Sequence, residues 1–206
     1  LHITMLRYLV LPLIWSLSLH AEKISFSGAE FQEIKEAAEF ILRTYPPEGY
    51  QYVFVGRSLG PVAALLENRG VNNLIQLPLS QMKDFVDNNS PEVEAVLAKH
   101  FEAFLPSGSL AQNKTLLFID FTHQGKTFLQ QRLALQNYIK TPAQFLAFMW
   151  HKNIEGMQKI KDLGIGVYPV NYTDKIQLAN IYGQRFWDGL WDYRYDEWSL
   201  YERFVP

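Results

Sequence analysis

Apolar residues along the chain alternate between two spacings, and each spacing predicts one kind of element. Between residues 30 and 44 they fall three or four positions apart, which is helical spacing, until Pro46 and Pro47 end the pattern. Short runs that are apolar throughout predict strands at 52–55, 73–77, 116–119, 145–150 and 165–170. Helical spacing returns at 61–66, 91–104, 125–138 and 154–163. Because fully apolar strands separated by helices are typical of a sheet covered on both faces, we predict a three-layer α/β/α domain with a mainly parallel, doubly wound sheet.

The first 21 residues have the pattern of a secretory signal peptide. Arg7 precedes an apolar run from 9 to 19, and Ala21 offers a small residue at a cleavage site. The run is shorter than the ~20 residues that cross a bilayer, so a permanent span is less favoured. We therefore expect residues 1–21 to be removed and the protein to be exported, to the periplasm or outside the cell, with an uncleaved anchor as the alternative.

Residues 22–206 are expected to form a single α/β domain. Residues 80–114, between the second and third strands, form a hood-like insertion that either covers a site or lies on the surface. Residues 171–206 are an aromatic-rich C-terminal extension, expected to pack across the domain or to bind a protein partner.

Composition excludes several classes of function. The chain of 206 residues has no Cys, which removes disulfides, thiolate nucleophiles and Cys zinc sites. Lys and Arg number 19 against 21 Asp and Glu, so there is no basic excess for nucleic-acid binding. The five His share no ligand spacing, and no protein metal site is predicted.

Polar loops follow three of the predicted strands, at 56–60, 120–127 and 151–153. In an open parallel sheet, ligands bind beyond the carboxyl ends of the strands. The second loop places Asp120 after an apolar strand, and Gly125 and Lys126 at the start of a helix. Backbone amides at a helix N-terminus attract an anion, and hydroxyl and ammonium groups add donors to phosphate oxygens. The pattern favours a phosphate site, although a polar loop with an ordinary helix cap would use the same residues.

This loop, LLFIDFTHQGKTF, resembles the phosphoribosyl-pyrophosphate motif of type I phosphoribosyltransferases. The order of elements over residues 30–170 is also similar to that fold. The resemblance implies that Asp120, Arg57 and Ser58 are the catalytic group, with Asp120 on the ribose and the other two facing pyrophosphate. It also implies a phosphate site lined by Thr122, Gln124, Gly125, Lys126 and Thr127, with His123 as a further group in the loop. A small phosphorylated molecule would be the ligand, and a diphosphate would bring Mg²⁺.

One residue departs from the family pattern and weakens the expectation of catalysis. Phe121 occupies the position of the family's second acid, and the loop is one residue short. A single carboxylate holds a ribose diol less firmly, so binding of a phosphate ester is a firmer expectation than transferase activity.

A second class of enzyme fits the first loop. GRSLG matches G-x-S-x-G between a strand and a helix, the context of a nucleophile elbow in α/β-hydrolases. Ser58, Asp120 and His151 follow in the chain order of that triad, each after a predicted strand. The alternative function is therefore an esterase or thioesterase, and a third is a non-catalytic exported interaction module. Against the hydrolase, no convincing strand precedes the elbow strand to carry the second oxyanion donor.

Overall fold

The computed structural model describes residues 27–56, 59–72, 74–79, 91–105, 110, 113–122 and 125–171. At residues 92–94, 96, 126, 127 and 130 it describes the main chain alone. The signal-peptide pattern, most of the C-terminal extension and most loop residues of the hood-like insertion lie outside these ranges. Within the described ranges, no helix combines the length and the apolar character needed to cross a bilayer.

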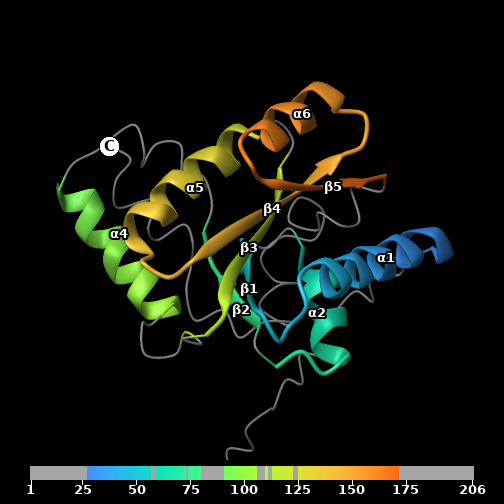
Figure 1. Ribbon diagram of the computed structural model, residues 1–206, viewed down its shortest axis with the longest axis horizontal. Coiled ribbons are helices and arrows are strands. Elements are labelled where there is room, and N and C mark those ends of the chain that lie inside the picture. The colour runs from blue at the N-terminus through green and yellow to red at the C-terminus, as the bar shows by residue number, and fades with distance from the viewer. Residues whose placement is uncertain are drawn as a thin grey trace, which may run out of the picture.

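A five-stranded parallel sheet forms the middle layer of the domain. In chain order the elements are α1 (Gly28–Thr44), β1 (Tyr50–Val55), α2 (Gly60–Asn68), β2 (Leu74–Leu77), α4 (Pro91–Phe104), β3 (Thr115–Thr122), α5 (Lys126–Tyr138), β4 (Ala143–Trp150), α6 (Ile154–Asp162) and β5 (Gly166–Val170). The strands lie in the order β2-β1-β3-β4-β5, and every neighbouring pair is parallel. Figure 1 shows α1 and α2 on one side of the sheet and α4, α5 and α6 on the other. The predicted three-layer α/β fold is confirmed.

Each predicted element is present, and the largest difference in length is at β3. The apolar run predicted a strand over 116–119, whereas β3 extends to Thr122. Asp120 is therefore inside the strand, in register with Ala147 of β4, rather than beyond its end. A buried polar side chain breaks the apolar run without breaking the backbone ladder, which is why the pattern placed the end of the strand too early.

Alternation along the strands divides the core into two clusters, one on each face of the sheet. On β3, Leu117, Ile119 and Phe121 pack with α1 and α2, whereas Leu116 and Phe118 pack with α4, α5 and α6. Successive strand residues point to opposite faces. Asp120 and Thr122 therefore face the second cluster, on the side of α5.

α1 is held by polar contacts at its N-terminus and in its second turn as well as by packing. Ser27 caps its N-terminus in a capping box with Glu30, which satisfies helix N–H groups. Farther along, Glu33 is only 5% exposed, and its Oε1 accepts hydrogen bonds from Asn171 N at 2.5 Å and Asn171 Nδ2 at 2.9 Å. The carboxylate of α1 thus holds the residue that follows β5.

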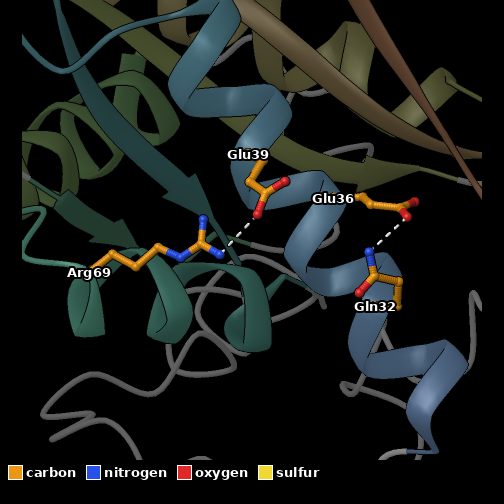
Figure 2. A network of polar contacts seen from close by, with 4 residues as sticks. All are labelled: Gln32, Glu36, Glu39 and Arg69. Atoms are coloured by element: carbon orange, nitrogen blue, oxygen red, sulfur yellow. Dashed lines mark hydrogen bonds and ion pairs between the residues drawn. The ribbon is translucent and has the colours of Figure 1, made fainter.

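The outer surface of α1 carries a polar network, drawn in Figure 2. Gln32 Nε2 donates to Glu36 Oε1 at 3.0 Å along the helix. Arg69, just after α2, makes an ion pair with Glu39 at 3.2 Å between Nη2 and Oε1. This pair links the two helices on the solvent side, above the apolar contact that joins them in the core.

Candidate functional site

The strand order places a switch point between β1 and β3. The two strands are neighbours in the sheet, yet α2 leaves β1 toward one face and α5 leaves β3 toward the other. A crevice between two such loops is where open α/β sheets bind ligands. The topology therefore brings together the loops that follow Val55 and Thr122, the first two loops that the sequence identified.

Gly56 turns the chain out of β1 in a conformation that side chains rarely adopt. Its φ is +66°, and a Cβ there would lie 3.1 Å from Leu79 O. Its N–H donates to Leu77 O at 2.8 Å, and its carbonyl accepts from Gln76 Nε2 at 2.9 Å. These contacts attach the start of the loop firmly to the end of β2, on the outer side of the switch point.

The two helices that flank the switch point begin without a capping side chain. The N-cap residues of α2 and α5 are Leu59 and Gly125, neither of which has a side-chain acceptor. In contrast, α1 is capped by Ser27 and α6 by Asn153, whose Oδ1 accepts from Gly156 N at 3.1 Å. In α2, Pro61 has no N–H and Val62 N donates to Leu59 O at 3.1 Å, so few of its first-turn donors are open to a ligand. The N-terminus of α5 has no side-chain cap, and its first-turn N–H groups and the helix dipole favour an anion there.

Asp120 and Thr122 bring oxygen atoms to the α5 side of this switch point. Asp120 is 7% exposed, and its Oδ1 accepts from Phe121 N at 2.7 Å. Thr122 is buried, and its Oγ1 accepts from Gly125 N at 2.9 Å, which shapes the turn into α5. The Thr122 oxygen is therefore part of the loop framework as well as a candidate phosphate contact.

Gly125 is required by both its backbone conformation and its surroundings. Its φ is +76°, and a Cβ would approach Ile160 Cδ1 to 2.8 Å. Ile160 belongs to α6 and is itself buried. Close packing of the loop against α6 thus fixes where α5 begins.

Phe121 points away from the crevice, into the cluster between the sheet and α1. It is 6% exposed and packs with the apolar side chains of that cluster. An acid at this position would be buried among apolar groups without a partner among the described contacts, which is costly. The residue that departs from the phosphoribosyltransferase pattern is thus part of the core.

His151 lies at the end of β4 but is not next to Asp120. Its Nδ1 is 3.2 Å from Val170 O, and because a carbonyl oxygen only accepts, Nδ1 carries the hydrogen. Asp120 is in register with Ala147, so His151 is four residues farther along, about 13 Å at strand spacing. The structure does not bring this pair within hydrogen-bonding distance, and a hydrolase at Ser58 would need another group to orient its histidine.

Several predicted site residues lie outside the described positions. Arg57, Ser58, His123 and Gln124 are in undescribed loop segments, and the side chains of Lys126 and Thr127 are not described. Their neighbours Gly56, Thr122 and Gly125 nevertheless fix where these loops start and end.

The α5 side of the sheet also holds polar groups that the sequence patterns missed. Gln51, His100 and Gln131 are buried there, at 6%, 3% and 4% exposure. His100 Nε2 donates to Pro78 O at 2.5 Å, joining α4 to the end of β2. Burial lowers the pKa of His100 from its ordinary value of 6.5, although the Pro78 contact acts in the opposite direction. Each of these residues lies at a position where the helical or strand periodicity would place an ordinary residue. The periodicity therefore could not show that a polar side chain is buried there.

Lys152, in the predicted loop 151–153, makes a contact with Trp150 that the sequence did not predict. The Lys152 ammonium lies 5.5 Å from the centroid of the Trp150 ring, a cation–π distance. Trp150 is 41% exposed although it ends a buried strand. The two side chains come together only because of the turn before α6. The sequence shows a tryptophan and a lysine but not their contact.

Comparison with known proteins does not assign the chain to a family. Neither models of protein families nor curated proteins match the chain. Among the described residues, no three His, Asp or Glu side chains come together in a way that could hold a metal ion.

Proposed function

We propose that the protein binds a phosphorylated ribose or a similar phosphate ester at the loops after β1 and β3. The observation that carries the proposal is the N-terminus of α5, which begins at the switch point without a side-chain cap. Two other helices, α1 and α6, have side-chain caps, and the residue before α4 lies outside the described positions. Anion binding supplies acceptors to N–H groups that no N-cap side chain serves.

The chemistry of the loop residues supports a phosphate rather than another anion. Lys126 and Thr127 open α5, and Arg57 and Ser58 follow Gly56 in the sequence. Ammonium, guanidinium and hydroxyl groups are the usual donors to phosphate oxygens. Asp120, buried two residues before the end of β3, would accept from a hydroxyl of the esterified group. A diphosphate ligand would bring Mg²⁺, for which Asp120 is the candidate ligand.

Binding is the core of the proposal, and transfer chemistry is its weaker part. The resemblance to type I phosphoribosyltransferases calls for two adjacent acids, and Phe121 replaces the second one within the apolar core. One carboxylate supplies less support for a positively charged ribosyl transition state than two do. If the chain is exported as its first 21 residues predict, a cytosolic ribosyl donor would also be an unusual substrate, which favours a site used for binding.

The experiment is thermal denaturation of the protein with phosphoribosyl pyrophosphate and Mg²⁺, with Mg²⁺ alone as the blank. A ligand at 100 times its Kd stabilises the folded state by about 2.7 kcal/mol, a clear rise in Tm. Lys126→Ala should remove most of the rise. Lys159→Ala is the matched control, because Lys159 is an exposed lysine of α6 paired with Glu155.

No rise with wild type, at ligand concentrations up to millimolar, would contradict the proposal. The hydrolase alternative has its own test in a fluorophosphonate probe. Labelling that disappears in Ser58→Ala would support an esterase, and absence of labelling at high probe concentration would argue against it.

A further inference from the structure

A cavity of about 510 Å³ lies at the amino edge of the sheet, at the opposite end of the strands from the proposed phosphate site. The strand order β2-β1-β3 places the segments that precede these three strands side by side at this edge. β1 has six residues, so roughly 17 Å of strand separates the two edges. The cavity has the size of a small-molecule site, and it is open to solvent.

Hydrogen bonds of the fold hold one wall of this cavity in place. Thr115 N donates to Gly49 O at 2.9 Å, and Lys114 Nζ donates to Pro47 O at 2.5 Å. The two bonds attach the segment before β1 to the start of β3. The lining residues Pro47 and Lys114 are therefore positioned by contacts within the chain.

The lining combines an apolar surface with two cations. Leu42, Pro47 and Val71 supply the apolar part, and Arg69 and Lys114 supply the positive charges. Val71 is buried, and the Arg69 side chain remains 29% exposed. An apolar wall with a few charged donors is the usual composition of a site for a small organic ion.

The Arg69 guanidinium is not used to close the end of α2. Cations near a helix C-terminus often serve its unpaired carbonyl groups. Here the backbone N–H groups of Arg69, Gly70 and Val71 already donate to the last carbonyls of the helix. The charged end of the side chain is therefore available for another partner.

Both cations have more donors than contacts within the described part of the chain. There, Arg69 makes one side-chain hydrogen bond, from Nη2 to Glu39 Oε1 at 3.2 Å, and Figure 2 shows this contact at one amino nitrogen. Lys114 makes one as well, to Pro47 O. A guanidinium carries five N–H groups and an ammonium three. Donors of both side chains thus remain for a ligand in the cavity they line.

We propose that this cavity binds a small carboxylic acid. Its carboxylate accepts from Arg69 and Lys114, and its apolar part packs on Leu42, Pro47 and Val71. A guanidinium fits a carboxylate through two parallel N–H bonds, and an ammonium adds a further charged donor. The proposal is independent of the phosphate site, because none of these residues belongs to the loops after β1 and β3.

The acids around the cavity favour a single negative charge over two. Glu39 pairs with Arg69, and the exposed Glu48 belongs to the lining itself. These two carboxylates offset much of the positive charge of the two cations. A dianionic phosphate ester would therefore gain less at this cavity than a carboxylate, whose charge is smaller and whose planar shape matches the guanidinium.

The test compares two probes that share an apolar ring and differ in charge. Binding of para-trifluoromethylbenzoate and of the matching neutral benzamide to the full chain is measured by fluorine NMR relaxation. The benzoate should relax faster in the presence of protein, with saturation as its concentration rises. The benzamide should bind at least about fivefold more weakly, because it lacks the charge that the two cations recognise.

Substitutions in the full chain locate the bound probe. Arg69→Gln and Lys114→Gln should each weaken binding of the benzoate about five- to tenfold, because each removes a charged donor. Glu39→Gln breaks the same ion pair but keeps the guanidinium, so the affinity should be kept or raised. Glu48→Gln removes a lining carboxylate and should raise it about twofold. Lys159→Gln, an exposed lysine of α6, is the matched control and should have no effect.

Equal binding of benzoate and benzamide would overturn the proposal, because the cavity would then not recognise the charge. Wild-type affinity in both Arg69→Gln and Lys114→Gln would overturn it too, since the probe would bind elsewhere. An equal loss in Glu39→Gln and Arg69→Gln would assign the effect to the ion pair rather than to a ligand contact. Lys126→Ala, the variant that tests the phosphate site, should bind the benzoate as wild type does, and a loss in that variant alone would place the probe at α5 and contradict the cavity site.

Discussion

The two faces of the sheet are built from different kinds of residues. On the α1 and α2 face, the buried side chains with polar groups among the described residues are Glu33 and Tyr52, whose hydroxyl donates to Tyr45 O. The face covered by α4, α5 and α6 buries five, namely Gln51, His100, Asp120, Thr122 and Gln131. Buried polar groups cost free energy unless they are hydrogen-bonded, and they reduce the apolar area that packing can use. We call the more apolar first face the scaffold face and the second face the polar face.

The largest expected effect comes from an apolar change in the scaffold face. Phe148 is fully buried on β4 and packs against Tyr168. Phe148→Ala should lower the free energy of unfolding by about 3–5 kcal/mol through lost burial and a cavity. Urea denaturation measures the loss. Phe148→Leu, closer in volume, should cost about 1–1.5 kcal/mol, and an equal loss for both would argue against close packing here.

On the polar face, a change of charge at Asp120 should affect binding of the proposed ligand more than folding. Asp120→Asn keeps an oxygen that can accept from Phe121 N, so stability without ligand should change by at most about 1 kcal/mol. The ligand-induced gain of about 2.7 kcal/mol at 100 times Kd should be lost. Thermal denaturation with and without phosphoribosyl pyrophosphate separates the two effects. A retained gain would remove Asp120 from the proposed site.

High pH should weaken the scaffold face. Burial raises the pKa of Tyr52 and of Tyr168 to about 12, against 10.0 in the unfolded chain. Because the unfolded state releases these protons first, this stabilisation is complete below pH 10 and is lost as the pH rises toward 12. Tyr52→Phe should reduce that alkaline loss.

At pH 8, where the tyrosine is protonated in both states, the stability of Tyr52→Phe measures only the loss of the hydrogen bond. Tyr52 Oη donates to Tyr45 O at 2.5 Å, and its removal should cost about 1–2 kcal/mol. Denaturation midpoints at pH 8 and pH 11 give both quantities. An alkaline slope identical to that of wild type would contradict the assignment to Tyr52.

Low pH should weaken the other face. Burial beside Phe104 lowers the pKa of His100 from 6.5, so the unfolded chain binds the proton first. This stabilisation is present above pH 6.5 and is lost as the pH falls through the lower folded value. His100→Gln can still donate to Pro78 O and should flatten the acid loss at a cost of about 1 kcal/mol at pH 8. Denaturation at pH 5 and pH 8 checks this, and an unchanged acid loss would contradict it.

The smallest effect is expected at the solvent surface of the scaffold face. Glu39→Gln removes the ion pair with Arg69, in which the Glu39 side chain is 56% exposed. Exposed pairs contribute about 0–1 kcal/mol, so the variant should be nearly as stable as wild type. Urea denaturation at low and high salt measures the difference. A loss above about 2 kcal/mol would show that the link between α1 and α2 depends on this pair rather than on packing.

Most of the fold could be predicted because each element is encoded locally. Fully apolar runs marked the strands, helical spacing marked the helices, and Pro46 marked the end of the α1 pattern. The strand order could not be read from these patterns, because it depends on contacts between residues far apart in the chain, such as Val53 with Phe118. The end of β3 was placed too early because Asp120 interrupts an apolar run without ending the strand.

The sequence predicted which loops form the candidate site, but not how their residues are arranged in space. The residue types after Gly56 and Thr122 predict a phosphate site, and the strand order brings the ends of β1 and β3 side by side. The sequence could not show that Phe121 is buried on the opposite face from Asp120, or that His151 donates to Val170 O. Each of these depends on register and strand length, which periodicity does not specify.

The contact between Glu33 and Asn171 also has a consequence for synthesis on the ribosome. The two residues are 138 positions apart, so the buried carboxylate of α1 meets its partner only after β5 has left the exit tunnel. The helices and strands nearest the N-terminus can associate earlier. The contact of α1 with the residue after β5 forms only once β5 has emerged. A nascent chain stalled before residue 171 should therefore carry a more loosely docked α1, exposed to proteases until β5 has emerged.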